Sequence, residues 1–119
     1  MAKASFTTFT DTTEQSVYAG ACRVHRVDVY PYPTQTAAAF VCFWDLANPT
    51  PGTDDTYMTL PIGTITVTGT RKITFLFPGG GIRFATACTI FCAAGPESAT
   101  AAATTLAPGK IDVFYSTGN

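Results

Sequence analysis

The sequence predicts an all-β fold, an antiparallel β-sandwich of jelly-roll or immunoglobulin-like type with about eight strands. Three observations predict it. Short runs of β-branched and aromatic residues recur along the chain, Gly, Pro, Asn and Asp interrupt these runs, and helical periodicity is almost absent. With 119 residues, the chain has the usual length of one domain. We therefore expect a single sandwich domain over residues 13–119, preceded by an N-terminal arm or edge strand over residues 1–12.

The first half of the chain contains three predicted strands. Residues 5–9 read Ser-Phe-Thr-Thr-Phe, and residues 21–30 alternate apolar and polar side chains toward their end. The third run, residues 38–46, is apolar on both faces except at Asp45. A strand of this kind is central and covered on both sides, by a second sheet and a loop or by a neighbouring subunit.

Alternation of apolar and polar residues also predicts the later strands, which are residues 58–62, 64–68, 71–77, 82–84, 87–93 and 110–116. Three consecutive glycines within residues 78–81 permit positive φ and predict a corner there. Residues 95–109 are rich in Ala and Thr and predict a long surface loop; the alternative is one short helix that begins at Pro96.

Charged residues make up only 13% of the chain, which is about half the usual share. Thr, Ser, Gly, Pro and Ala must therefore cover much of the surface. Such a surface has little electrostatic repulsion to keep neighbouring molecules apart. We therefore expect part of it to contact other protein in an assembly.

Seven basic and eight acidic residues give a net charge of −1. The basic residues are scattered along the sequence except for the pairs Arg23/Arg26 and Arg71/Lys72. Because there is no basic stripe to neutralise phosphates, we expect no nucleic-acid partner. No apolar run has the length of a signal peptide or a membrane span, so we expect no membrane partner and synthesis in a host cytoplasm.

The four cysteines are Cys22, Cys42, Cys88 and Cys92. In a secreted chain this even number would predict two disulfides, but three of the four lie in apolar runs. This favours buried free thiols, with a structural disulfide as the alternative. Cys88 and Cys92 face the same side of a strand about 13 Å apart, too far for two ligands of one metal ion. We expect no metal and no cofactor.

Three further features invite a catalytic or ligand-binding interpretation. The only histidine, His25, would need Asp28, Asp45 or a cysteine beside it to build a hydrolase triad or dyad. Asp54 and its acidic neighbour could join a calcium loop, but the alternating ligands of such a loop are missing. Glycines 79–81 lack the Lys-Ser/Thr pair and the helix of a phosphate loop. We expect a surface or half-buried histidine, a solvated turn, a β-corner and no enzyme.

Aromatic side chains supply the candidate binding residues. A cluster of tyrosines and tryptophan with prolines 31 and 33 could anchor a protein interface or act as a ligand platform, and its apolar neighbourhood favours the interface. Two phenylalanines near the N-terminus could belong to a binding arm. The candidate interface residues are Phe6, Phe9, Tyr30, Tyr32, Phe43 and Trp44.

Several segments, taken in order, carry a family resemblance. They are residues 25–30, His-Arg-Val-Asp-Val-Tyr; residues 38–45, an aromatic-rich strand that ends in an acidic residue; residues 51–54, Pro-Gly-Thr-Asp, before the Leu-Pro-Ile of residues 60–62; the Gly-Ile-Arg-Phe corner of residues 81–84 that leads into residues 87–93; and the Val-Phe-Tyr of residues 113–115. In this order they resemble small virion proteins of tailed bacteriophages, of the capsid decoration (cement) type. The resemblance spans most of the chain from about Val24 onward.

The resemblance implies a β-sandwich that assembles on a virion, frequently as a trimer, and it brings no catalytic residue. We therefore expect a non-enzymatic virion structural protein that binds and stabilises the phage capsid shell. Its expected partners are the major capsid protein and further copies of itself. The alternative is a tail, neck or spike component that binds a host receptor or carbohydrate through Tyr30, Tyr32 and Trp44. A hydrolase built around His25 is the third hypothesis.

Overall fold

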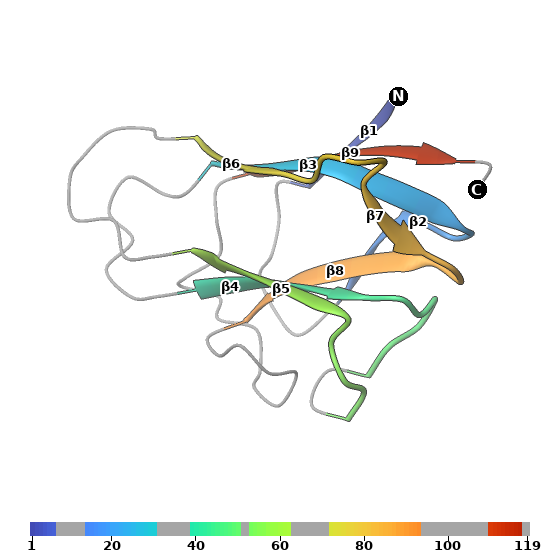
Figure 1. Ribbon diagram of the computed structural model, residues 1–119. Helices are drawn as coiled ribbons and strands as arrows, with labels where there is room; N and C mark the ends of the chain where they lie inside the picture. Colours follow the sequence, from blue (N-terminus) through green and yellow to red (C-terminus); the bar gives the residue numbers. More distant parts are fainter. Residues whose placement is uncertain (7–13, 31–38, 51–52, 63–71, 94–109, 118–119) are drawn as a thin grey trace.

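The computed structural model describes residues 1–6, 14–30, 39–50, 53–62, 72–93 and 110–117. In this part of the chain, nine strands form two antiparallel sheets that pack face to face, and no helix is present (Figure 1). The predicted all-β sandwich is therefore confirmed. None of the described segments provides a helix that could cross a membrane.

The five-stranded sheet is built around its longest strand, β3 (Cys22–Tyr30). On one side β3 pairs with β9 (Lys110–Thr117), which in turn pairs with the edge strand β1 (Ala2–Phe6). On the other side β3 pairs with β6 (Ile73–Leu76) along its second half and with β7 (Ile82–Phe84) along its first half. β6 and β7 thus follow one another along the same edge of β3.

The four-stranded sheet has the order β2-β8-β4-β5. Its central strands are β8 (Cys88–Ala93) and β4 (Ala39–Trp44), and its edges are β2 (Gln15–Tyr18) and β5 (Met58–Ile62). Residues 85–87 carry the chain from β7 in one sheet to β8 in the other (Figure 1). This short crossing ties the two layers together at one end of the sandwich.

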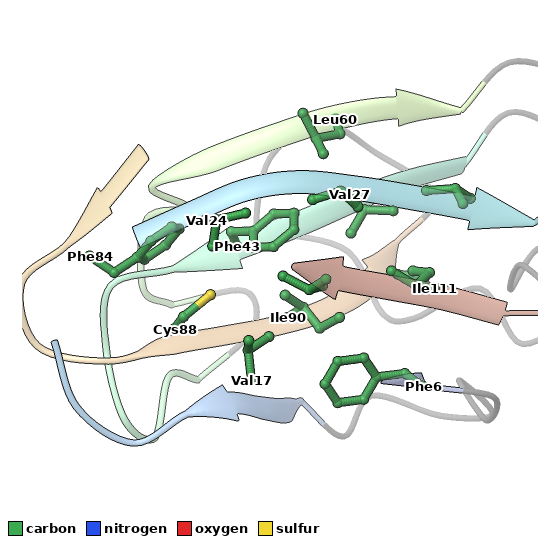
Figure 2. Close-up of a cluster of buried hydrophobic side chains, with 14 of the residues drawn as sticks. Phe6, Val17, Val24, Val27, Phe43, Leu60, Phe84, Cys88, Ile90 and Ile111 are labelled. Carbon is green, nitrogen blue, oxygen red and sulfur yellow. The ribbon is translucent and has the colours of Figure 1, made fainter. Parts of the chain in front are cut away.

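The main core lies between the sheets and is filled by inward-facing side chains of both (Figure 2). Val24 and Val27 of β3, Phe43 of β4, Ile90 of β8 and Ile111 of β9 have no exposed surface. Period-two alternation turns these residues to one side of each strand, and burying them removes apolar area from water. This layer is the dominant source of stability for the fold.

β4 is buried on both faces, as its uninterrupted apolar run predicts. Phe43 points into the main core, whereas Cys42 and Trp44 form a second cluster with Phe91 on the other side of the sheet. The Trp44 and Phe91 rings stack with centroids 4.8 Å apart, and Trp44 Nε1 donates a hydrogen bond to the Asp54 carbonyl at 3.1 Å. The outer face of the four-stranded sheet is therefore covered around β4 and β8.

A β-bulge at His25 lets both halves of β3 face the core. The register between β3 and β9 shifts between Val24 and Arg26, which leaves His25 as an extra residue on β3. Even-numbered residues face inward before the bulge and odd-numbered residues after it, as the burial of Val24 and Val27 shows. Opposite the bulge the chain leaves the sheet edge between β6 and β7, and Phe77 donates its N–H to the His25 carbonyl at 3.0 Å.

The predicted glycine corner is confirmed at this point. Gly79, Gly80 and Gly81 have φ values of 78°, 97° and 81°. A Cβ at Gly81 would lie 2.6 Å from the Val24 carbonyl oxygen and 2.9 Å from His25 Nδ1, whereas nothing lies within 4 Å of a Cβ at Gly79. Gly81 is therefore needed both for its φ and for its lack of a side chain.

Two strands differ from the sequence expectation. The first strand begins at Ala2, earlier than the expected residue 5, and it is an edge strand whose Phe6 is buried in the core; residues 7–9 of the expected strand lie outside the described residues. β2 was not predicted, because its Gln-Ser-Val-Tyr run contains a single buried apolar residue, Val17. The strand predicted at residues 64–68 and the loop predicted at 95–109 lie outside the described residues.

We predict that Gly81→Ala destabilises the protein more than Gly79→Ala. Both substitutions force an L-residue to positive φ, which costs about 1–2 kcal/mol, but only the Gly81 methyl also collides with backbone, which adds about 1–3 kcal/mol. Urea unfolding of the two variants and the wild type measures the difference. Equal free energies of unfolding for the two variants would contradict the close approach at Gly81.

Candidate binding face on the five-stranded sheet

The outer face of the five-stranded sheet gathers the basic residues of the described chain. They are contributed by β1, β3, β7 and β9 and by the residue before β6, and their strand neighbours face the core, so alternation turns them outward. The basic face is defined by Lys3, Arg23, Arg26, Lys72, Arg83 and Lys110. Basic residues that are scattered in the sequence thus share one surface, which corrects the expectation that no basic surface exists.

A polar row crosses the middle of the basic face. Ser5, Asp112, Asp28 and Thr74 are successive cross-strand partners on β1, β9, β3 and β6. The two carboxylates lie on directly paired residues and are only 3% and 2% exposed. Ser5 Oγ donates a hydrogen bond to Asp112 Oδ1 at 2.6 Å, and Thr74 Oγ1 donates to Asp28 Oδ1 at 2.9 Å.

Three cations neutralise this pair of carboxylates. Arg26 Nη2 lies 3.3 Å and Lys72 Nζ 4.0 Å from Asp28 Oδ2, and Lys110 Nζ lies 3.5 Å from Asp112 Oδ2. Like charges on paired residues of neighbouring strands repel, and nearby opposite charges offset that repulsion. The carboxylates therefore serve to hold the cationic side chains on the face.

The adjacent row of side chains lines a hollow. Lys3, Phe114, Arg26 and Leu76 are successive partners on β1, β9, β3 and β6. The Leu76 side chain is 67% exposed although the residues on either side of it pack against the core. The hollow has a volume of about 340 Å³ and is lined by Met1, His25, Arg26, Leu76 and Phe114.

Arg26 is the polar centre of the hollow. Its guanidinium carbon lies 4.1 Å above the centroid of the Phe114 ring, a cation–π contact. Its Nε is buried and finds no hydrogen-bond acceptor among the described residues. A buried donor without a partner is costly, so an acceptor group brought into the hollow would gain a hydrogen bond there.

His25 is half-buried and its Nε2 lies 2.7 Å from Ser116 Oγ. Neither carboxylate that the sequence offered as a partner bonds to it. Asp28 is engaged by Thr74 and two cations, and Asp45 lies at the end of β4 in the other sheet. Within the described residues, therefore, no carboxylate completes a Ser-His-Asp arrangement.

Asp45 has a structural task at the crossing from β7 to β8. Its carboxylate accepts hydrogen bonds from the backbone N–H groups of Ala85 at 3.0 Å, Thr86 at 2.7 Å and Ala87 at 3.1 Å. Burial raises the pKa of the Asp45 carboxyl. The three backbone donors and the nearby Arg83 together lower that pKa by more than burial raises it, so the pKa lies below its ordinary value of 3.8. The ionised carboxylate thus fastens the crossing between the sheets.

All four cysteines are buried free thiols, as the sequence favours. The neighbouring Cys22 thiol of the other sheet, together with burial, raises the pKa of the Cys88 thiol, and burial also raises the pKa of Cys92. Asp54 Oδ2 accepts the Thr50 N–H at 2.7 Å within a closed turn. No group of three or more potential metal ligands occurs in the described chain.

The candidate interface residues do not share one surface. Phe6 and Phe43 belong to the main core, and Trp44 is fully buried in the second cluster. Tyr30 lies on the basic face, so it and Trp44 occupy the outer faces of different sheets and cannot form the single platform that the sequence suggested. The remaining two candidates lie outside the described residues: Phe9 and Tyr32.

Met1, Leu76 and Phe114, which line the hollow, and Ser116 were not among the site residues expected from the sequence. A signal was nevertheless present for two of them. Leu76 is an apolar residue at a wet-face position between Phe75 and Phe77, and Phe114 occupies the equivalent position on the last strand. An apolar residue out of phase with an alternating strand points to a surface that some other group covers.

Comparison of the chain with protein-family models, curated proteins and solved structures finds no match. On the basic face, cations, exposed apolar side chains and a buried donor without a described acceptor lie close together.

We predict that Asp45→Ala lowers the free energy of unfolding by about 1–2 kcal/mol at neutral pH, because three backbone donors lose their acceptor. The carboxyl pKa is lower in the folded than in the unfolded chain. Its contribution is therefore complete above pH of about 4 and disappears as the pH falls through the folded-state value.

Urea unfolding of wild type and Asp45→Ala at decreasing pH tests this prediction, with Asp45→Asn as a control that keeps one acceptor oxygen. The stability difference between wild type and the alanine variant should shrink in acid. A difference that stayed constant from neutral pH to pH 2 would contradict the role of the ionised carboxylate.

Proposed function

We propose that this chain is a non-enzymatic structural protein of a virus particle, a capsid decoration protein that binds and stabilises the shell through its basic face. The observation that carries the proposal is the exposure of Leu76 and Met1, at 67% and 82%, beside a hollow on an outward sheet face. Apolar side chains gathered on such a face gain free energy when a partner covers them.

The virion setting comes from the resemblance of residues 24–115 to phage decoration proteins and agrees with the low charge of the chain. In this setting the partners are the major capsid protein and further copies of the chain, with a trimer as the favoured assembly. A trimer that binds the shell through several linked faces gains avidity, so a single face of moderate affinity is sufficient. The protein would reside in the virion after synthesis in the host.

The tail, neck or spike alternative relies on carbohydrate stacking by Tyr30, Tyr32 and Trp44, of which Tyr32 lies outside the described residues. Because Tyr30 and Trp44 lie on different sheets and Trp44 is fully buried, these two rings do not form one platform. The hydrolase alternative retains the His25–Ser116 contact but lacks an orienting carboxylate among the described residues.

Co-sedimentation with particles that lack this protein tests the proposal. We expect the purified chain to bind saturably, and Leu76→Asp to weaken binding by about tenfold or more, as for a residue at the centre of an interface. Leu46→Asp is the matched control, because Leu46 is 40% exposed and lies in the connection after β4, away from the basic face. The Leu46→Asp variant should bind particles as the wild type does.

Two outcomes would contradict the proposal. If the folded wild-type chain does not bind particles at any ionic strength, the decoration role is wrong. If Leu76→Asp and Leu46→Asp bind equally well, the chain decorates particles through another surface.

A further inference from the structure

The described part of the chain is electrically polarised between its two sheets. The five-stranded sheet carries six basic side chains against two buried carboxylates, Asp28 and Asp112, a net charge of +4. The strands of the four-stranded sheet and their described flanks carry four acidic residues and no basic one, a net charge of −4. These acidic residues are Glu14, Asp45, Asp54 and Asp55.

We infer that the basic face binds an acidic protein surface that seats one projecting apolar side chain in the hollow beside Arg26. The identity of that surface as part of a virion rests on the proposed function, whereas its chemistry follows from the residues of the face. Complementary charge brings such a surface to the face and orients it there.

The hollow explains why the partner presents an apolar group. Its rim is formed by Leu76 and Met1, which are largely exposed, and the Phe114 ring lies on its wall. An apolar side chain seated there covers all three and removes their area from water. A carbonyl or carboxylate next to that side chain can accept a hydrogen bond from the Arg26 guanidinium, because the Arg26 side chain is 41% exposed.

The aromatic rings of the face argue for a protein partner and against a single-stranded nucleic acid. Single-stranded nucleic acids bind where aromatic rings are open for base stacking. Here Arg26 covers the Phe114 ring, and Lys110 Nζ lies 5.3 Å from the centroid of the Tyr30 ring.

NMR titration of the full, isotope-labelled chain tests the inference without the particle. The probe is a blocked peptide with glutamates on both sides of one phenylalanine. Its matched controls are the same peptide with glutamine for glutamate and with alanine for phenylalanine. We expect the acidic peptide to shift the amides around Arg26, Leu76 and Phe114, and each control peptide to bind about tenfold more weakly. Added salt should weaken the binding of the acidic peptide, because it screens the attraction between opposite charges.

A pair of double variants separates local charge from net charge. Lys3→Gln with Arg23→Gln removes two positive charges from the basic face and should weaken binding of the peptide about tenfold. Ser16→Glu with Thr53→Glu adds two negative charges at exposed positions, one on β2 and one in the connection before β5. This variant should bind the peptide nearly as tightly as the wild type does. Unfolding curves confirm that each variant is folded before its titration is interpreted.

Several results would overturn the inference. One is the absence of amide shifts on the basic face when the acidic peptide is added, and another is equal binding of the glutamate and glutamine peptides. A third is tighter binding of an oligothymidine than of the peptide at the same residues. The last is amide shifts of the basic face that depend on the concentration of the chain alone, which would make a second copy of the chain the occupant. Peptide binding without particle binding leaves the inference standing and removes the virion role. Particle binding that is unchanged in the Lys3→Gln/Arg23→Gln variant overturns the inference and leaves the virion role standing.

Discussion

The bulge at His25 is the constraint on which the rest of the structure depends. β3 pairs with β9 on one side and with both β6 and β7 on the other. Without the extra residue, strict alternation would turn either Val24 or Val27 away from the core. With it, both valines are buried, and two adjacent polar residues, His25 and Arg26, lie on the outer side of the same strand.

The bulge also places the glycine corner and the hollow. The edge of β3 changes partner from β6 to β7 at this point, and the intervening residues leave the sheet through a corner that fits only because Gly81 has no side chain. The hollow then forms between the bulged residue and the β6 and β9 residues next to it, Leu76 and Phe114. Local backbone irregularity and candidate binding surface therefore have one origin.

The two sheets cover their outer faces in different ways. The four-stranded sheet buries Trp44 and Phe91 in a second cluster, so its apolar outer residues are satisfied within the chain. The five-stranded sheet uses paired charges across Asp28 and Asp112 and leaves Leu76 exposed. Asp28 and Asp112 thus bind cations of their own face, and Leu76 remains directed outward.

Sequence by itself determined the sandwich class, the doubly buried strand around Phe43, the glycine corner and the burial of the cysteines. These features depend on alternation and on residue-specific φ preferences, which act within a few residues of the chain. It could not locate β2, whose only buried apolar residue is Val17, and it could not show that the six basic side chains share one face. Alternation shows whether a side chain faces the core or the outer side of its own strand. It does not show which strands are neighbours, because the neighbours are set by pairing between distant segments, such as β1 with β9. Only that tertiary pairing brings Lys3, Phe114, Arg26 and Leu76 into one row, because their order across the sheet is unrelated to their order in the chain.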